Sequence, residues 1–531
     1  MNKIAKYLNQ HIVGNVYDKP SILEAYSTDN SILKITPRFV ALPKNTDDIR
    51  RLVRFSNQLS EKGFNLPITV RGSGLDKTGA DLGSGMVIST EHLNEVLEID
   101  ERSRLVRTQA GATLEKLQAV LAEHGLTIPV HHNPKETIGG LIASFPSDPL
   151  ARRYGSIYYY VDRLEAVLAT GDCIQTTNLT LRGLSRAKNL PDFEGSVYRG
   201  LDEILNSDFD TIEDLSSLEP NSRGYRMICQ VFNAKRRTFD LLPLFFGSQG
   251  TLGVISEIIL QAEPMDYEPT RMAIGFKSIR PAMDFLQTVS SFNPIAVDIY
   301  DARIFRQAAE HGKEIEILQP MRGKNFYIIA TFTGRPGSIR KRLKKLIRYL
   351  PESTTVAVEN PDNTDDFTEL DSAISSYLND DIAGERTPIV DGAYIPIEHL
   401  ANFLVDLKTM EEAYGFGLHI FGSCATETYS VRPELDFNTI IGRQDMVRFL
   451  SDYHNLIKSH DGALVIGGGE GRVKGAVTND DYQPIEKDLY LKIKNAFDPH
   501  NILAPEAKLG ADHANLLRNL RTTTKPGIIS K

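Results

Sequence analysis

Three glycine-containing stretches decide the fold of this chain. They read RGSGLDKTG at residues 71–79, TIGGLIAS at residues 137–144 and FGSQGTLGVI at residues 246–255. The first follows a predicted strand at Leu66–Arg71, and glycine permits positive φ, so consecutive backbone N–H groups can converge on an anion such as a pyrophosphate. The spacing fits neither a Rossmann fingerprint nor a P-loop. By itself, this stretch is at least as consistent with a plain turn.

The second and third stretches add further glycine backbone. The pair Gly139-Gly140 is flanked by small residues, which would let a flat ligand approach closely, and tight packing of a helix on a strand explains the pattern equally well. In the third stretch, glycines precede the β-branched run Val254-Ile255, which also fits a β-bulge. Each stretch alone is therefore ambiguous.

Taken together and in this order, the three stretches resemble the FAD-binding domain of the vanillyl-alcohol-oxidase-type flavoproteins, also called the PCMH-type FAD domain. Further similarities are YSTDNS at 26–31, PKN at 43–45, RYGS at 153–156, LEAVLATG at 164–171, GTLG at 250–253 and FDPHNILAP at 497–505. Within that family the chain is most similar to the glycolate oxidase subunit and D-lactate dehydrogenase group. The resemblance implies an α+β fold, in which a PCMH-type domain of two α+β subdomains carries a sheet-and-helix substrate (cap) domain.

The resemblance also implies FAD, with its pyrophosphate on the first two stretches. The residues expected to contact it are Arg71, Gly72, Ser73, Gly74, Leu75, Thr78, Gly79, Thr137, Gly139, Gly140, Ser144, Gly250, Val254 and Ile255. Relatives that attach flavin covalently carry His where this chain has Leu75, and the second stretch contains no Cys. We therefore expect noncovalent FAD.

The catalytic motifs of the resembling group are altered in this chain. That group oxidises D-2-hydroxy acids with a base and a metal held by two His and one Glu, in GHAGDGxxHVRP-like and GGSxSGEHGxGRxRG-like motifs. Aligned on these motifs, residues 421–433 and 462–475 place Ser423, Ser430, Gly467 and Gly468 at the ligand and base positions. Serine is a poor ligand for a divalent metal and glycine offers none. We expect no metal, a rebuilt substrate pocket and an unidentified base.

Several residues near these motifs are weak candidates for the missing roles. Arg432 and Arg472 could bind a substrate carboxylate bidentately, although structural ion pairing explains them as well. The possible acid–base groups are Glu470, Glu427, Tyr429 and His419, the last being more typical of a core or surface histidine. We name Arg432, Glu470 and Arg472 as candidate substrate residues.

The rhythm of predicted elements suggests the domain organisation. A predicted helix at Asn45–Ser60, capped by Thr46, belongs to an alternating α and β region, and residues 270–360 show a βαββαβ-like order. Residues 361–380 are acidic and suggest a surface connection. We expect an N-terminal segment (1–32), an FAD-binding domain (33–265), a substrate domain (266–495), a return segment (496–510) and a mobile or partner-binding tail (511–531).

Composition excludes several classes of function. A net charge of −9 gives no general attraction to nucleic acid, and three Cys in 531 residues exclude a disulfide scaffold or an iron–sulfur site. No run of 18 apolar residues is present, so we expect no transmembrane segment and a cytoplasmic setting.

The sequence therefore favours an FAD-dependent oxidoreductase of a small-molecule CH–OH substrate. Oxygen, a quinone or a separate protein would accept its electrons. The alternatives are a flavin-binding pseudoenzyme acting as a subunit or regulator and, more remotely, an FAD-free structural relative.

Overall fold

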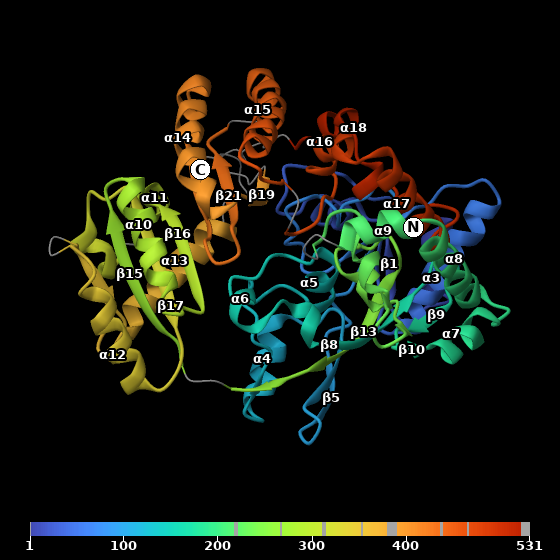
Figure 1. The fold of residues 1–531 in the computed structure, drawn as a ribbon. Coiled ribbons are helices and arrows are strands. Elements are labelled where there is room, and N and C mark those ends of the chain that lie inside the picture. The colour runs from blue at the N-terminus through green and yellow to red at the C-terminus, as the bar shows by residue number, and fades with distance from the viewer. Residues whose placement is uncertain are drawn as a thin grey trace, which may run out of the picture.

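The computed structural model describes residues 2–216, 221–265, 268–310, 315–351, 354–379, 390–435, 439–464 and 467–521. The fold is α+β, as predicted, and Figure 1 shows two domains side by side. The first domain comprises residues 2–265 together with the returning segment 467–521, and the second comprises residues 270–464. Within the described ranges, every helix is too short or too polar to span a lipid bilayer.

The first domain begins with a four-stranded sheet in the order β1-β2-β4-β3. Its strands are β1 (Asn15–Tyr17), β2 (Phe39–Leu42), β3 (Ile68–Arg71) and β4 (Met86–Ser89), and its helices are α1 (Lys3–Asn9), α2 (Pro20–Ala25) and α3 (Thr46–Glu61). Helix α3 buries Ile49, Leu52 and Val53 against the sheet. Its N-cap is Asn45, whose side chain accepts a hydrogen bond from the Asp48 amide, so the predicted cap at Thr46 was wrong by one residue.

A five-stranded antiparallel sheet, ordered β5-β6-β13-β8-β9, forms the second half of this domain. Its strands are β5 (Val96–Asp100), β6 (Leu105–Gln109), β8 (Val161–Val167), β9 (Cys173–Gln175) and β13 (Val254–Gln261). The β-branched run after the third glycine stretch becomes central strand β13, which pairs with β6 and β8.

Smaller elements surround these two sheets. The helices are α4 (Leu114–Ala122), α5 (Ile138–Ser144), α6 (Ala151–Tyr154), α7 (Leu181–Lys188), α8 (Phe193–Ser207), α9 (Phe209–Ser216), η1 (Ile157–Tyr160), η2 (Arg226–Gln230) and η3 (Leu242–Phe245). The short strands are β7 (Leu126–Thr127), β10 (Leu179–Thr180), β11 (Phe232–Asn233), β12 (Thr238–Phe239) and β14 (Glu263–Pro264).

The second domain is one seven-stranded antiparallel sheet, ordered β18-β15-β17-β16-β20-β21-β19. The strands are β15 (Thr270–Phe276), β16 (Ala296–Asp301), β17 (Phe326–Phe332), β18 (Val356–Val358), β19 (Val390–Tyr394), β20 (Leu418–Ser423) and β21 (Thr428–Pro433). The helices are α10 (Ile279–Ser290), α11 (Ala302–Glu310), η4 (Glu316–Met321), α12 (Pro336–Ile347), α13 (Thr364–Asn379), α14 (Ile397–Tyr414) and α15 (Ile440–Ser459).

Each face of this sheet has its own apolar core. Residues of α10, α12, α14 and α15 pack on one face, and residues of α11, η4 and α13 pack on the other. The predicted surface connection at 361–380 was wrong for 364–379, because α13 buries Phe367 and Leu370 in the second core. Residues 380–389 lie outside the described residues.

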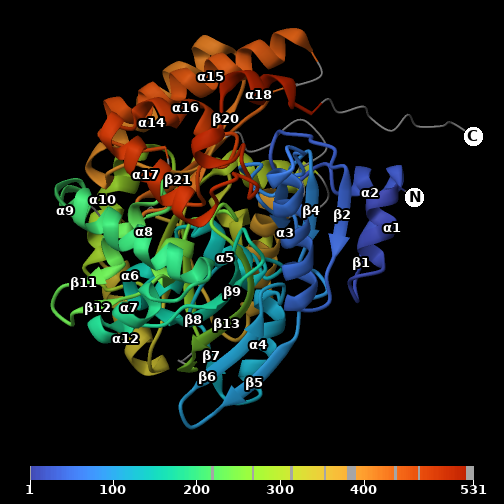
Figure 2. The same cartoon turned by 90° about the vertical axis from the view of Figure 1, so that its right-hand side faces the viewer.

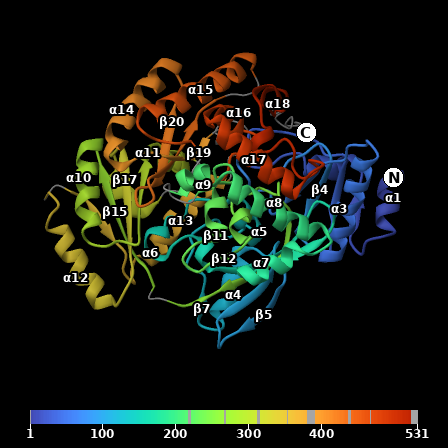
Figure 3. The same ribbon diagram turned by 45° about the vertical axis from the view of Figure 1, so that its right-hand side comes forward.

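The chain returns to the first domain well before residue 496. The returning elements are α16 (Gly475–Thr478), η5 (Asn479–Asp481), α17 (Pro484–Phe497), η6 (Lys508–Gly510) and α18 (His513–Arg518). Helix α17 lies beside α8 (Figure 3) and contributes Leu489, Tyr490 and Phe497 to the first domain's core. Helix α17 therefore packs with the first domain, whereas Ala476 and Val477 of α16 belong to the apolar core of the second domain.

The last described segment joins the N-terminal sheet. The Ile68 amide donates to the Ile502 carbonyl and the Ala504 amide to the Ile68 carbonyl, both at 2.7 Å. Residues 511–521, expected to form a mobile tail, instead include α18 and a bridge between Leu33 and Leu520, near the N-terminal elements (Figure 2). The remainder of the expected tail, 522–531, lies outside the described residues.

A buried ion pair fastens the returning segment. The ammonium group of Lys508 contacts the carboxylate of Glu470 and donates to the carbonyls of Ser222 and Gly247 at 3.0 and 2.9 Å. Burial by itself would raise the pKa of Glu470, but Lys508 and the hydrogen bond from Tyr482 outweigh it and lower the pKa. Glu470 is therefore held ionised inside the protein.

We predict that Lys508→Met destabilises the protein by about 3–5 kcal/mol, because it leaves a buried carboxylate without its cation. Chemical unfolding followed by circular dichroism measures the effect. The exposed Lys492, which pairs with Asp208 and Asp488 at the surface, provides the control, and Lys492→Met should barely move the unfolding midpoint. Because the folded-state pKa of Glu470 is lowered, the stabilisation should disappear as pH falls through that value. Equal effects of the two variants would contradict the prediction.

Candidate functional site

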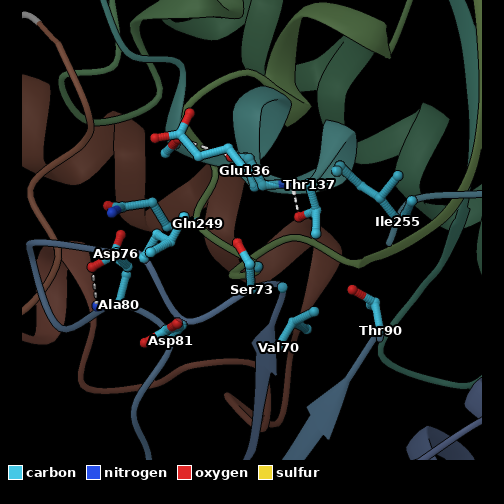
Figure 4. A pocket seen from close by; sticks show the side chains of 18 of the residues that line it. Val70, Ser73, Asp76, Ala80, Asp81, Thr90, Glu136, Thr137, Gln249 and Ile255 are labelled. Atoms are coloured by element: carbon cyan, nitrogen blue, oxygen red, sulfur yellow. Dashed lines mark hydrogen bonds between the residues drawn. The ribbon is translucent and has the colours of Figure 1, made fainter. Parts of the chain in front are cut away.

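The three glycine stretches meet around one cavity in the first domain. Its empty volume is about 850 Å³ including the open mouth. Figure 4 shows Glu136, Thr137 and Ile255 on one side and Val70, Ser73 and Asp81 on the other. The expected cofactor residues that line it are Gly72, Ser73, Gly74, Leu75, Thr137, Gly139, Gly140, Ser144, Gly250 and Ile255.

The first stretch turns away from the end of β3 in a conformation that requires glycine. Gly74 has φ +75°, and a Cβ there would lie 2.2 Å from the Arg71 guanidinium. The carboxylate of Asp76 holds the loop by accepting hydrogen bonds from the amides of Thr78 and Ala80 at 2.7 and 3.0 Å. The local sequence therefore fixes this wall of the cavity.

The second stretch is the start of helix α5. The Thr137 hydroxyl caps the helix by accepting from the Gly140 amide at 3.2 Å. Gly139 packs on Ala110, where a Cβ would come within 2.8 Å of the Ala110 side chain. Gly140 is different, because its Cβ would meet only the Thr137 hydroxyl and otherwise face open space. Gly139 therefore serves tight packing, and Gly140 leaves space in the cavity beside the helix.

The third stretch connects the cavity to the returning segment through Gln249. The Gln249 amide donates to the Ala143 carbonyl of α5, and its side chain donates to the Thr78 hydroxyl at 3.1 Å. Its side-chain oxygen accepts from the Gly471 amide at 2.9 Å. Sequence reasoning missed Gln249, although a long polar side chain between glycines before a buried strand is a signal that could have identified it.

Four of the expected cofactor residues do not line this cavity. Arg71 lies 3.8 Å from Asp81 and over the Tyr26 ring, whereas Val254 is fully buried in an apolar core. Thr78 and Gly79 instead meet the returning segment, because their carbonyls accept from Arg472. The lining residues that we did not expect are Val70, Asp76, Ala80, Asp81, Thr90, Ala110, Glu136, Ala143, Ser248, Gln249 and Gly253.

Three carboxylates gather beside the first stretch, namely Asp29, Asp76 and Asp81. Burial raises the pKa of Asp29 well above its usual range and that of Asp81 to about 6. The charges of Arg71 and Arg472 oppose the increase in the pKa of Asp81.

The cavity walls fit a dinucleotide cofactor. Glycine stands where a side chain would project into open space at Gly140, and glycine backbone forms the wall at Gly72, Gly74 and Gly250. A long cofactor with a flat ring and a pyrophosphate needs such close approach to backbone. Fold and cavity together define a flavoprotein of the two-domain type.

Comparison with known families agrees with this class. A family described as FAD binding domain matches residues 37–177, and one described as FAD linked oxidases, C-terminal domain, matches residues 268–507. The chain belongs to the vanillyl-alcohol-oxidase/PCMH-type FAD-binding oxidoreductases, and FAD is its cofactor.

Individual relatives place the chain among FAD-linked oxidoreductases. It is 25% identical over 497 residues to D-2-hydroxyglutarate dehydrogenase of Pseudomonas putida, covering 90% of this chain and 49% of that protein. It is 24% identical over 492 residues to D-lactate dehydrogenase of Archaeoglobus fulgidus, covering 91% and 95%. The chain thus spans about half the length of the D-2-hydroxyglutarate dehydrogenases that it matches.

Solved structures share the fold. The 4-ethylphenol oxidase from Gulosibacter chungangensis superposes with a TM-score of 0.68 at 16% identity, covering 96% of this chain and 97% of that one. p-Cresol methylhydroxylase superposes with a TM-score of 0.66 at 14% identity, covering 94% and 95%.

The positions expected to lack metal ligands lie at the junction of the two domains. Ser430 accepts from the Gly392 amide at 3.1 Å, and a Cβ on Gly392 would lie 2.9 Å from the Gly467 carbonyl. The Gly468 amide donates to the Phe145 carbonyl at 3.4 Å, just beyond α5. The structure therefore brings Ser430, Gly467 and Gly468 together beside the helix that lines the cavity.

Ser423 occupies the same junction. It pairs with Thr428 across the β20–β21 hairpin, and the Thr428 hydroxyl donates to the Ser147 hydroxyl at 3.1 Å. Ser147 also lies against Gly467, where a Cβ would come within 2.8 Å of the Ser147 amide.

The three candidate substrate residues are all buried. Glu470 is engaged by Lys508, Tyr482 and the Gly224 amide, so its geometry is that of an internal ion pair. The Arg472 guanidinium donates to the Gly79 carbonyl at 3.2 Å and faces the aspartates beside the first stretch. Arg432 stacks over the Phe421 ring. This geometry favours structural roles for Glu470 and Arg472.

We predict that Gly140→Val removes FAD while leaving the fold intact, because its side chain would enter the cavity with only the Thr137 hydroxyl to displace. Gly74→Val should also lose FAD, and the positive φ at this position adds a folding cost. Flavin absorbance per mole of protein and thermal unfolding measure the two effects.

The matched control is Gly183→Val in helix α7, where a Cβ meets ordinary contacts at 3.4 Å. It should keep its full flavin content. A full complement in Gly140→Val would show that the second stretch does not contact the cofactor.

We also predict noncovalent attachment. Leu75 lines the cavity, and Cys173, Cys229 and Cys424 are absent from its described lining. Acid precipitation should release the yellow colour into the supernatant, and colour retained in the pellet would refute the prediction.

Proposed function

We propose that this protein is an FAD-dependent dehydrogenase that oxidises a CH–OH group of a small molecule, resembling D-2-hydroxy acid dehydrogenases but working without a metal. One observation carries the proposal. The four aligned motif positions lie near helix α5, which lines the cavity. They offer two hydroxyls and no carboxylate or imidazole, because they are Ser423, Ser430, Gly467 and Gly468.

The backbone itself supports the loss of the metal. Gly468 has φ +82°, which L side chains rarely adopt, and a Cβ on Gly467 would collide with the Ser147 amide. A Glu-His pair could not occupy these positions unless the loop moved. At residues 467–468 this chain would therefore differ from the resembling enzymes in its backbone conformation as well as in its side chains.

FAD, when bound in the cavity, supplies the two-electron acceptor for the substrate's hydride. The protein's own residues would bind and orient the substrate and take its hydroxyl proton. The relatives named D-lactate dehydrogenase and D-2-hydroxyglutarate dehydrogenase support a small 2-hydroxy acid as the substrate class. Oxygen, a quinone or a separate protein would reoxidise the flavin.

A flavin-binding subunit or regulator without turnover is the second candidate. The same loss of side chains at the junction favours it. Anaerobic mixing with a panel of D-2-hydroxy acids, alcohols and sugars separates the two, since bleaching of the flavin by any of them demonstrates turnover chemistry.

We predict less than stoichiometric zinc or manganese in the purified protein and no bleaching of the flavin by D-lactate within minutes. Loss of a general base typically lowers a rate by about 10²–10⁴-fold, and loss of a polarising metal adds to this. Elemental analysis and anaerobic absorbance spectroscopy provide the measurements.

A D-lactate dehydrogenase relative, treated identically, serves as the positive control. Stoichiometric metal together with chelator-sensitive turnover of D-lactate would overturn our alignment of both motifs.

A further inference from the structure

The sheet face that carries Ser423 and Ser430 also carries a carboxylate, Asp298. Strand β16 pairs with β20 so that Asp298 lies opposite Ser423 and Tyr300 lies opposite Phe421. Paired residues of an antiparallel ladder project to the same face, and alternate residues of one strand do so as well. Asp298, Ser423, Thr428 and Ser430 therefore share one face of the second domain's sheet.

The part of this sheet face around Thr428 contacts the segment that follows helix α5. Helix α5 lines the cavity with Gly140, Ala143 and Ser144. Immediately beyond it, the Ser147 hydroxyl accepts a hydrogen bond from Thr428, and the charge of Asp148 acts on Asp298. Asp298 thus stands at the domain junction, on the side of the second domain that faces the flavin-binding half.

We propose that Asp298 accepts the proton of the substrate hydroxyl, in the role for which the aligned motif positions no longer provide a base. This inference rests on the proposed function. In the step, the substrate O–H bond breaks and a carboxyl O–H bond forms on Asp298. The α-carbon C–H bond gives its electron pair as hydride to FAD, and the C–O bond becomes a carbonyl.

The surroundings of Asp298 suit this role. Burial raises its pKa to about 7, the hydroxyl of Ser423 acts in the opposite direction, and Asp371 and Asp148 add to the increase. An effective base has a pKa near the working pH. Asp298 would therefore be partly ionised at neutral pH and able to exchange a proton.

The other titratable groups around Asp298 are less suited to accept a proton. Burial raises the pKa values of Tyr300, Cys424 and Tyr429, and the charge of Asp298 adds to each increase, so all three stay protonated at neutral pH. On α13, Asp371 forms an ion pair with Arg271, and the charges of Arg271 and His131 both act to lower the pKa of Asp371. Tyr429 moreover lies in the core on the opposite face.

The remaining candidates from the sequence are engaged elsewhere. The carboxylate of Glu427 accepts from the Ile397 amide at 3.0 Å at the hairpin turn. His419 is buried at the far end of β20 and lies 3.4 Å from the carboxylate of Glu434. These contacts leave Asp298 as the better-placed carboxylate.

The test compares FAD-loaded wild type with Asp298→Asn, which keeps the size of the side chain. With a hydroxy acid from the panel, the wild-type rate of flavin bleaching should rise about tenfold per pH unit below pH 7 and level off above it. Asp298→Asn should be slower by about 10²–10⁴-fold and lose that pH dependence. Its FAD content and reduction by dithionite should equal those of wild type.

A second readout needs no turnover. Infrared difference spectra should show a carboxyl group that titrates near pH 7 in wild type and is missing in Asp298→Asn. Asp371→Asn should lower the midpoint of this titration, because it removes a negative charge, whereas Ser423→Ala should raise it. These two variants keep the inference testable if Asp298→Asn does not fold.

The failures are distinguishable. If wild type is bleached and Asp298→Asn behaves identically in rate and pH profile, the inference is wrong and the proposed function stands. If no compound bleaches wild-type flavin, the proposed function fails and this inference fails with it. If no carboxyl titrates near pH 7, or Asp371→Asn and Ser423→Ala leave the midpoint unchanged, the inference is overturned.

Discussion

The close contact between the returning backbone and the cavity walls is the constraint on which the rest of the structure depends. Gly469 and Gly471 lie so near Gln249 and Thr78 that a Cβ on either would come within 2.4 and 2.1 Å of those side chains. Gln249 binds Thr78 and the Gly471 amide at the same time. One side chain therefore couples the first glycine stretch, the third glycine stretch and the segment that leaves the second domain.

That contact also relates the altered motif to the fold. In this chain the residues at 467–471 serve as spacers that let two backbones meet, and the buried pair of Glu470 and Lys508 fixes them in place. A loop committed to this packing is poorly suited to hold metal ligands. The acid–base chemistry would then have to come from another element of the junction, and strand β16 offers the carboxylate of Asp298 there.

The conformation of the cavity wall at the first glycine stretch was predictable from local sequence, because glycine at a turn acts over a few residues. Gly74, which has a positive φ in that stretch, is an example. Asp298 was not predictable in this way, since its strand reads as an ordinary half-buried segment and its partner Ser423 is distant in the chain. Only the register of β16 on β20 unites them.

Other differences have equally local causes. Helix α13 was not predicted because the acidic residues of its first turn suggested an exposed segment. The spacing of Phe367 and Leu370 indicates a buried helix face only when the sheet that they pack against is known. The packing of α17 on the first domain was not predictable, because α17 is an ordinary amphipathic helix and the sequence does not state which domain its apolar face will contact.

The parallel bridge between Ile68 and Leu503 has a consequence for the order of events during synthesis. Strand β3, which leads into the first glycine stretch, receives its outer neighbour from a segment made more than four hundred residues later. Until residues 467–508 have been synthesised, strand β3 and Gln249 lack the contacts that this segment makes with them. We therefore expect capture of the cofactor to follow the synthesis of residues 467–508.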